Sequence, residues 1–174
     1  MNLHHERLDG VSPIIRGAVM RLCDLTEIQL KRKLLVVHGW RSVAQQSALF
    51  QQGRAMNRET GEWEIVEPAN VVTKAKPGSS AHNVVVRADG KPAALGVDLI
   101  PVTFDGKPDW EPGEAFWLAF YKLAWTCGLD PLGDPIGAYL PGDKGHVEEP
   151  GWRLKLAGLG LILPVSEVPH VSEA

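Results

Sequence analysis

The chain has 174 residues and a mass of 19.0 kDa, which is the usual size of one folded domain. Apolar residues make up 44% and charged residues 22% of the chain, proportions that exclude disordered and fibrous classes as the main state. Lys and Arg total 18 against 21 Asp and Glu, so the formal net charge is −3. This mild acid excess argues against nucleic acid or an anionic membrane as the main partner.

The cysteines and the N-terminus indicate the compartment in which the protein is made. Cys23 and Cys127 both fall in apolar helical patterns, so we expect buried free thiols and no disulfide. No stretch approaches the roughly 20 apolar residues that cross a bilayer. The N-terminus has no basic-then-apolar signal pattern, so we expect synthesis in the cytoplasm. Nothing in the sequence indicates an oligomeric state.

The first part of the chain is expected to form a helix at 12–32, a strand at 34–38 and a helix at 42–50. Ser12 can cap the first helix, and Ser42 can cap the second. The strand is a short run of mostly apolar, partly β-branched residues, as expected for a buried strand.

The remaining elements are expected to be a hairpin at 82–99, a helix at 112–127, a short strand at 146–149 and a short helix at 152–159. Asp89-Gly90 is the turn signal of the hairpin. In its second arm, alternation places Leu95, Val97 and Leu99 on a core face and Asp98 on the other. The polar, irregular stretch 54–78 is long for a loop, so a lid over a site is one interpretation.

Together these elements predict an α+β fold in a single domain, with a small antiparallel sheet flanked by helices. The domain is expected to span 12–164, between an N-terminal tail (1–11) and a C-terminal tail (165–174). No repeat, low-complexity tract or linker divides it.

His82 and Asp98 form the first candidate pair. A three-residue turn at 89–91 would place them opposite each other, with Cβ atoms roughly 5 Å apart and within reach of one metal ion. A two-residue turn would put them on opposite faces. A simple cross-strand hydrogen bond is the alternative without a metal.

A second candidate group is Asp143 with His146, three residues later. A carboxylate in this position can take a proton from a water activated by a metal that the His binds. Two His and one carboxylate form a catalytic zinc set that leaves one position open for water. Arg41 would add a cation for a developing oxyanion. A surface turn and a surface salt bridge are the alternatives for these residues.

Three segments occur in a characteristic order between about residues 39 and 152. They are Gly39-Trp40-Arg41-Ser42 with Gln45, Ser80-Ala81-His82 followed by Gly96-Val97-Asp98, and Asp143-Lys144-Gly145-His146. This order resembles the zinc peptidases that act on bacterial cell-wall peptides. They include D-Ala-D-Ala dipeptidases, D,D-carboxypeptidases and phage L-alanyl-D-glutamate endopeptidases. The resemblance implies a hedgehog/D,D-peptidase-like fold.

The resemblance also implies a role for each matching residue. The implied ligands of one Zn²⁺ per chain are His82, Asp98 and His146, with Asp89 as the fallback carboxylate. Asp143 would be the general base, and Arg41 would stabilise the transition state. The expected substrate-binding residues are Ser80 and Gln45, together with Trp40 and Trp152, which adjoin the site in the sequence.

The activity implied is hydrolysis of a peptide bond in the peptidoglycan stem peptide. A small domain without a signal favours an L-Ala-D-Glu endopeptidase of the phage or prophage endolysin type, acting on the cell wall after release. The alternative within the family is a D,D-carboxypeptidase that removes terminal D-Ala. The alternative of another class is a non-catalytic zinc module that binds the wall or serves structure. The presence of both Asp143 and Arg41 favours the enzyme.

Overall fold

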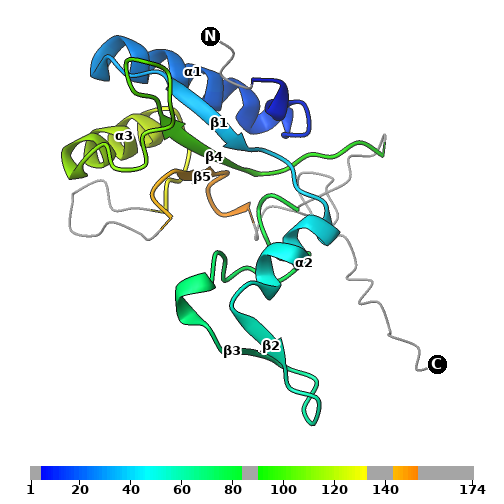
Figure 1. The fold of residues 1–174 in the computed structure, drawn as a ribbon. Helices are drawn as coiled ribbons and strands as arrows, with labels where there is room; N and C mark the ends of the chain where they lie inside the picture. Colours follow the sequence, from blue (N-terminus) through cyan, green and yellow to red (C-terminus); the bar gives the residue numbers. More distant parts are fainter. Residues whose placement is uncertain (1–4, 84–89, 133–142, 153–174) are drawn as a thin grey trace.

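A computed structural model describes residues 5–83, 90–132 and 143–152 of the protein (Figure 1). In chain order the elements are η1 (His5–Leu8), α1 (Pro13–Leu30), β1 (Leu34–His38), α2 (Val43–Gln51), β2 (Arg54–Met56), β3 (Trp63–Ile65), η2 (Pro68–Asn70), β4 (Gly96–Pro101), α3 (Glu114–Thr126) and β5 (His146–Glu148). A three-stranded antiparallel sheet has the order β1-β4-β5. The predicted combination of a small antiparallel sheet with helices is confirmed.

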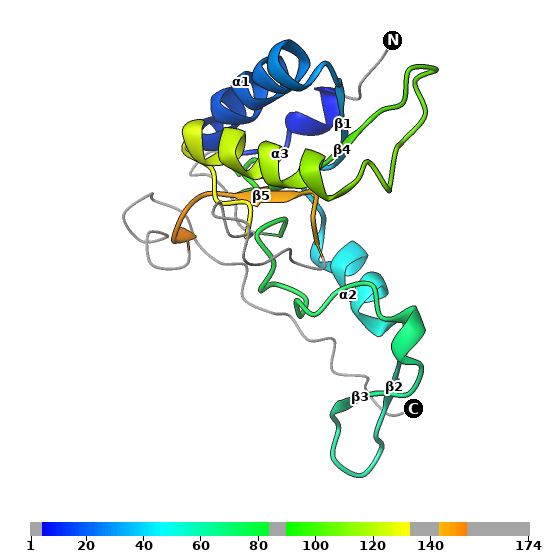
Figure 2. The same ribbon diagram turned by 90° about the vertical axis from the view of Figure 1, so that its left-hand side faces the viewer.

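Helices α1 and α3 pack together on one face of this sheet (Figures 1 and 2). α1 starts where predicted, because the Ser12 side chain accepts a hydrogen bond from the Ile14 N–H at 3.3 Å. Its apolar stripe, together with inward residues of the strands, forms the core. Burial of each large apolar side chain contributes about 1.5–3 kcal/mol, so this layer provides most of the stability.

α3 differs slightly from its predicted range, because it begins at Glu114 with Gly113 as a cap that has no side chain. It ends as expected before Gly128, whose φ of +81° suits glycine. The aromatic face of the helix is buried in the core through Trp117, Phe120 and Tyr121.

β4 is the central strand, with β1 and β5 on its two edges, and its two faces have different surroundings. Val97 and Leu99 are fully buried in the core beneath the helices. Asp98, between them in sequence, points to the other face. The predicted alternation is therefore confirmed, and a polar side chain is held on the face that the helices leave uncovered.

A β-bulge at the end of β1 adds a histidine to that second face. Val36 pairs with Leu99, but the next pair is His38 with Asp98, so Val37 is the extra residue. The Arg7 guanidinium donates to the carbonyl oxygens of Val36 and Val37, at 3.1 and 2.7 Å. These hydrogen bonds satisfy carbonyls at the bulge, which turns His38 toward Asp98.

The predicted pairing of His82 with Asp98 in a hairpin at 82–99 is wrong, because in the described residues β4 pairs with β1 and β5. The neighbours of Asp98 across the sheet are His38 and His146, whereas residues 81–83 form a turn. The alternating pattern indicates a strand but not its partner, and here pairing with two distant strands satisfies both edges of β4. Residues 84–89, which include Asp89 and most of the predicted first arm, lie outside the described residues.

Other segments also differ from expectation. The stretch 54–78, expected to be irregular, contains the β2–β3 hairpin and η2. The segment 1–11, expected to be a tail, contributes Leu8 and Val11 to the core. The predicted helix at 152–159, beyond Trp152, and the C-terminal tail lie outside the described residues. No helix in the part of the chain that the structure describes is long and apolar enough to span a membrane.

Both cysteines are buried and free, as predicted. Burial, reinforced by the charge of Asp24, raises the pKa of the Cys23 thiol to about 12 from its usual 9.0. The thiolate is the reactive form, so the reactive fraction at pH 8 falls by about a thousandfold.

We therefore expect Cys23 to resist Ellman's reagent at pH 8 in the folded protein and to react within minutes in denaturant. The Cys127→Ala variant isolates its signal. Rapid labelling of folded Cys127→Ala protein would contradict the packing of Cys23 against the core.

Candidate metal centre

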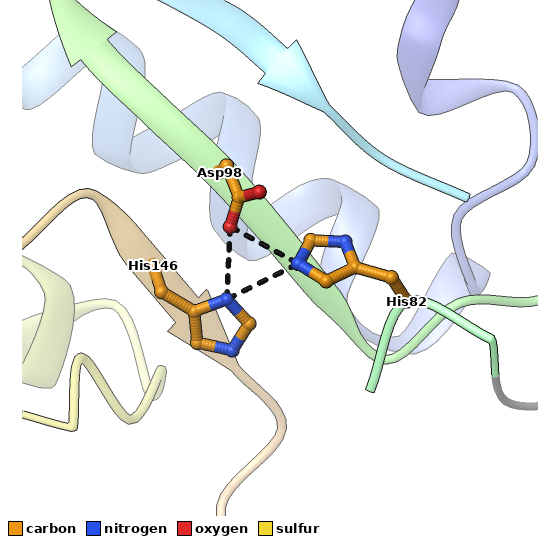
Figure 3. A group of neighbouring side chains, drawn as sticks. All are labelled: His82, Asp98 and His146. Carbon is orange, nitrogen blue, oxygen red and sulfur yellow. Dashed lines mark hydrogen bonds and ion pairs between the residues drawn. The ribbon is translucent and has the colours of Figure 1, made fainter. Parts of the chain in front are cut away.

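Three atoms of the kind that bind metals meet on the face of the sheet away from the helices (Figure 3). His82 Nε2 lies 3.0 Å from Asp98 Oδ1, and His146 Nδ1 lies 2.9 Å from the same oxygen. The two imidazole nitrogens are 3.2 Å apart. Asp98 comes from β4, His146 from β5 and His82 from the turn at 81–83. The structure thus brings together the three predicted ligands.

The other nitrogen of each imidazole has its own acceptor. His82 Nδ1 lies 2.7 Å from the Gly39 carbonyl oxygen, and His146 Nε2 lies 3.1 Å from Glu148 Oε2. A carbonyl and a carboxylate only accept, so these nitrogens are the donors. In the neutral imidazoles the lone pairs of His82 Nε2 and His146 Nδ1 are then available to a metal, which would take the place of the hydrogen bonds that these two atoms make to Asp98. Such outer hydrogen bonds fix the orientation of metal-binding histidines.

Hydrogen bonds hold the turn that carries His82 against the segment after β1. The Arg41 N–H donates to the His82 carbonyl oxygen at 3.0 Å. The Asn83 side-chain amide donates to the carbonyl oxygens of Arg41 (2.9 Å) and Ser42 (3.2 Å). The Ser80 hydroxyl accepts from the His82 N–H at 3.3 Å. The buried His82 ring is therefore positioned by backbone contacts that are distant in sequence.

The second oxygen of Asp98 has different partners. Asp98 Oδ2 accepts from the Arg41 guanidinium and lies 3.4 Å from His38 Nδ1. Burial opposes ionisation of Asp98, but the His82 charge and hydrogen bonds from His146, His38 and His82 hold its pKa well below the usual range. Asp98 is therefore a carboxylate, which is the form that binds a metal.

The pKa values of Asp143 and His146 shift upward. Asp143 lies at the exposed rim, where partial desolvation and the Asp98 charge raise its pKa above the usual 3.8. Burial lowers the pKa of His146, but hydrogen bonds to Asp98 and Glu148 outweigh burial and raise it above 6.5. A carboxyl group with a raised pKa beside a metal site is suited to proton transfer.

The donor set fits zinc. Two imidazole nitrogens and one carboxylate oxygen form a known catalytic combination, with the fourth position left to water. Bond lengths of about 2.0–2.1 Å in a tetrahedron imply ligand atoms roughly 3.4 Å apart. The observed separations of 2.9–3.2 Å come close to this value.

The triad opens into a cleft of about 850 Å³. Its walls include the polar face of the sheet, residues 71–75, Trp110, Glu111 and residues 143–146. Arg41 and Ser80 also line the cleft. A volume of this size is typical of ligand-binding clefts.

The other predicted substrate-binding residues lie elsewhere. The Gln45 side chain accepts from the Ser42 N–H at 2.8 Å and completes a capping box at the start of α2. Trp40 is 42% exposed and lines an adjoining pocket of about 410 Å³, which shares Val37 and His38 with the cleft. Trp152 is 1% exposed, so its ring offers almost no surface to a substrate. Substrate contacts by these residues stay predictions.

Sequence reasoning missed Gln46 and Glu148 and gave no role to Asn83. Gln46 is fully buried, and its Oε1 accepts from the Arg41 guanidinium at 3.4 Å. The spacing of Gln46 from Phe50, four residues later, marks it as inward-facing on the helix. Glu148 lies two residues after His146 in a strand, and that spacing places both on one face.

No protein-family model matches the chain. Among solved structures, it is similar to a vancomycin-resistance D,D-pentapeptidase VanY, from a VanB-type cassette, as a mutant in complex with Zn(II). The identity is 18%, the match covers 88% of this chain and 81% of that chain, and the TM-score is 0.53. It is also similar to VanYB in complex with D-alanine-D-alanine, at 17% identity, 88% and 80% coverage and a TM-score of 0.53.

A third similar structure is an L,D-carboxypeptidase DacB from Streptococcus pneumonia. The identity is 20%, the match covers 91% of this chain and 77% of that chain, and the TM-score is 0.48. At these identities the two VanY structures establish the fold of this chain, a small mixed arrangement of helices and antiparallel sheet like that of VanY D,D-peptidases.

Gly96 is the residue whose size the metal centre restricts most directly. A Cβ atom there would lie 2.8 Å from Ala81 Cβ and 2.8 Å from His146 Cε1. We expect Gly96→Ala to displace the His146 ring and weaken zinc binding by at least about tenfold. Competition with a chromogenic zinc chelator measures this affinity.

The matched control is Gly17→Ala in α1, where a Cβ meets nothing within 4 Å. That variant should keep its zinc affinity and gain about 1 kcal/mol in unfolding free energy. Equal zinc affinity in Gly96→Ala and the original protein would show that close contact at Gly96 does not position His146.

Proposed function

We propose that this protein is a zinc-dependent peptidase that hydrolyses a peptide bond in the stem peptide of peptidoglycan. The observation that carries the proposal is the convergence of His82 Nε2, Asp98 Oδ1 and His146 Nδ1 at the end of a cleft. The outer hydrogen bonds to Gly39 and Glu148 leave both imidazole lone pairs directed at one point. The fold shared with a Zn(II)-bound VanY supports the same activity.

When bound, zinc would lower the pKa of a water molecule to roughly 7 and polarise the scissile carbonyl. His82, Asp98 and His146 would hold the ion. Asp143, at the rim, would accept a proton from the attacking water and return it to the leaving amine. Its raised pKa suits both transfers, because the carboxyl group must take up and release a proton within one turnover.

Arg41 has a positioning role in this scheme. Its guanidinium holds Asp98 Oδ2, which leaves Oδ1 for the metal, and its second amino group donates to Gln46. Arg41 also lines the cleft, so its charge adds to the positive potential that a developing oxyanion would experience.

Of the two stem-peptide bonds considered, the comparisons favour the one at the D-Ala end. One similar structure is described as a D,D-pentapeptidase and another is bound to D-alanine-D-alanine. We therefore propose D,D-carboxypeptidase activity ahead of L-Ala-D-Glu endopeptidase activity. Release as a phage or prophage endolysin stays a prediction from the sequence.

The non-catalytic alternative makes different demands on the same residues. A zinc site that serves only structure needs neither an acidic residue at the rim nor an open cleft. Asp143 and the cleft both favour an enzyme. The alternative predicts zinc binding without hydrolysis.

Digestion of purified peptidoglycan, read by mass spectrometry with and without a chelator, tests the activity. We expect chelator-sensitive products that have each lost one D-Ala. New N-terminal D-Glu would instead identify an L-Ala-D-Glu endopeptidase. No product from several wall types, with zinc fully bound, would refute the enzyme in favour of the non-catalytic module.

Substitutions separate the metal ligands from the proposed base. His82→Ala and His146→Ala should each lose bound zinc and activity together, because two protein ligands rarely retain the ion. Asp143→Asn should keep zinc and lose turnover by about 10²-fold or more. Metal content by mass spectrometry and hydrolysis rates measure both effects.

Full zinc retention in both histidine variants would refute the ligand assignment. An Asp143→Asn variant with undiminished turnover would show that another group moves the proton.

A further inference from the structure

One wall of the cleft is a short stretch of chain, residues 71–75, that follows η2. All five residues line the cleft, and the segment has neither helical nor sheet structure. Lys74 is the only cation among them and is exposed. Within the segment, the one backbone–backbone hydrogen bond among the described residues runs from the Val71 N–H to the Pro68 carbonyl oxygen at 3.3 Å, so the part around Lys74 needs side-chain anchors to present that residue in a defined place.

Side chains from α2 and β2 provide these anchors on both sides of Lys74. The Gln46 amide donates to the Thr73 hydroxyl (3.4 Å) and to the Ala75 carbonyl oxygen (3.0 Å). The Arg54 guanidinium donates to the Thr73 carbonyl oxygen at 3.0 Å. Because Gln46 also accepts from Arg41, one buried amide connects this wall to the metal centre.

The charges around the cleft leave Lys74 available. The charged residues that line it, apart from the histidines, are Arg41, Lys74, Glu111, Asp98, Asp143, Lys144 and Glu148. The Arg41 charge is already paired with Asp98. Lys74 makes no ion pair within residues 5–83, 90–132 and 143–152. An unneutralised ammonium on the wall of a cleft attracts an anionic group of a ligand.

Lys144 is the other cation at the cleft without an ion pair among the described residues. It directly follows Asp143 in the sequence, so a carboxyl group is adjacent to it along the chain. Backbone hydrogen bonds hold the chain around Lys144, from the Leu99 N–H to the Gly145 carbonyl oxygen (2.9 Å) and from the His146 N–H to the Asp143 carbonyl oxygen (3.4 Å). We assign the contact with an anionic group to Lys74 because the neighbouring Asp143 carboxylate offers Lys144 a negative charge, and the test below includes Lys144.

We propose that Lys74 is a specificity-determining residue that binds the C-terminal carboxylate of the peptide substrate, and that Gln46 and Arg54 position it. The inference rests on the proposed function and names the group that would distinguish a carboxypeptidase from an endopeptidase. An enzyme with this contact prefers peptides with a free C-terminus, because amidation removes the negative charge.

The test compares one peptide, ending in D-Ala-D-Ala, as the free acid and as the C-terminal amide. Calorimetry on the zinc-loaded Asp143→Asn protein measures binding without turnover. We expect Lys74→Gln in this background to weaken binding of the free acid by about fivefold at low salt, and Lys74→Arg to restore it. Binding of the amide should not change, and added salt should shrink the difference.

Lys76→Gln is the matched control, since Lys76 is an exposed cation two residues further on that does not line the cleft. An equal effect of Lys76→Gln would contradict the proposal. So would an equal loss for acid and amide, no loss with Lys74→Gln, or no binding of either peptide. Loss only with Lys144→Gln would reassign the contact.

The outcomes also separate this inference from the proposed function. Selective binding of the acid that depends on Lys74, without hydrolysis by the original protein, would refute the peptidase and leave the carboxylate contact standing. Hydrolysis that is indifferent to Lys74 would refute the contact alone. Where hydrolysis occurs, Lys74→Gln should raise KM for the free acid and leave kcat unchanged.

The positioning role has its own readout in hydrogen exchange. Gln46→Met removes the amide at similar size, so the Ala75 backbone amide, which donates to the Thr73 hydroxyl at 3.2 Å, should exchange faster. Gln51→Met, on the exposed side of α2, is the control. Unchanged exchange in Gln46→Met would show that Gln46 does not hold the wall.

Discussion

The carboxylate of Asp98 is the group around which the polar half of this structure is organised. A buried carboxylate without partners costs several kcal/mol, so the fold must surround it with donors. One oxygen faces His82 and His146, and the other faces Arg41 and His38. These partners come from the end of β1, the segment after it, a distant turn and β5. The partners of the Asp98 charge therefore bring four separate parts of the chain into contact with β4.

Close backbone packing makes this convergence possible. A Cβ at Gly39 would lie 2.1 Å from the Arg7 carbonyl oxygen, and one at Gly145 would lie 2.2 Å from the Leu99 carbonyl oxygen. Gly39 directly follows His38 and Gly145 directly precedes His146, while Gly96 lies two residues before Asp98. Because these glycines have no side chains, the backbone segments that carry His38, His82 and His146 can lie close to β4. The imidazoles of the three histidines are then within reach of the Asp98 carboxylate.

Local signals in the sequence predicted the elements well. Ser12 and Ser42 mark helix starts, and the run at 34–38 is a strand, because caps and hydrophobic patterns act within a few residues. The grouping of His82, Asp98 and His146 was also predictable, but mainly from the order of motifs along the chain. The predicted register that joined His82 to Asp98 was wrong, although the two residues do meet.

What could not be predicted depends on contacts between distant segments. The strand pattern of β4 does not reveal that β1 and β5 are its neighbours, and a bulge at Val37 has no strong local signal. Gln45 and Gln46 are chemically identical neighbours, yet one caps a helix and the other is buried against Arg41. Only the direction of each side chain in the folded helix separates their roles.

The difference between the two faces of β4, one apolar and one polar, has a consequence for folding accuracy. A slip of one residue in its pairing would turn Asp98 into the apolar layer under the helices and push Val97 or Leu99 among the histidines. Such a misaligned chain would bury an unpaired charge and lose two apolar contacts at once. The residues proposed for chemistry therefore also specify the register of the sheet, because only the correct register brings His82, Asp98 and His146 together.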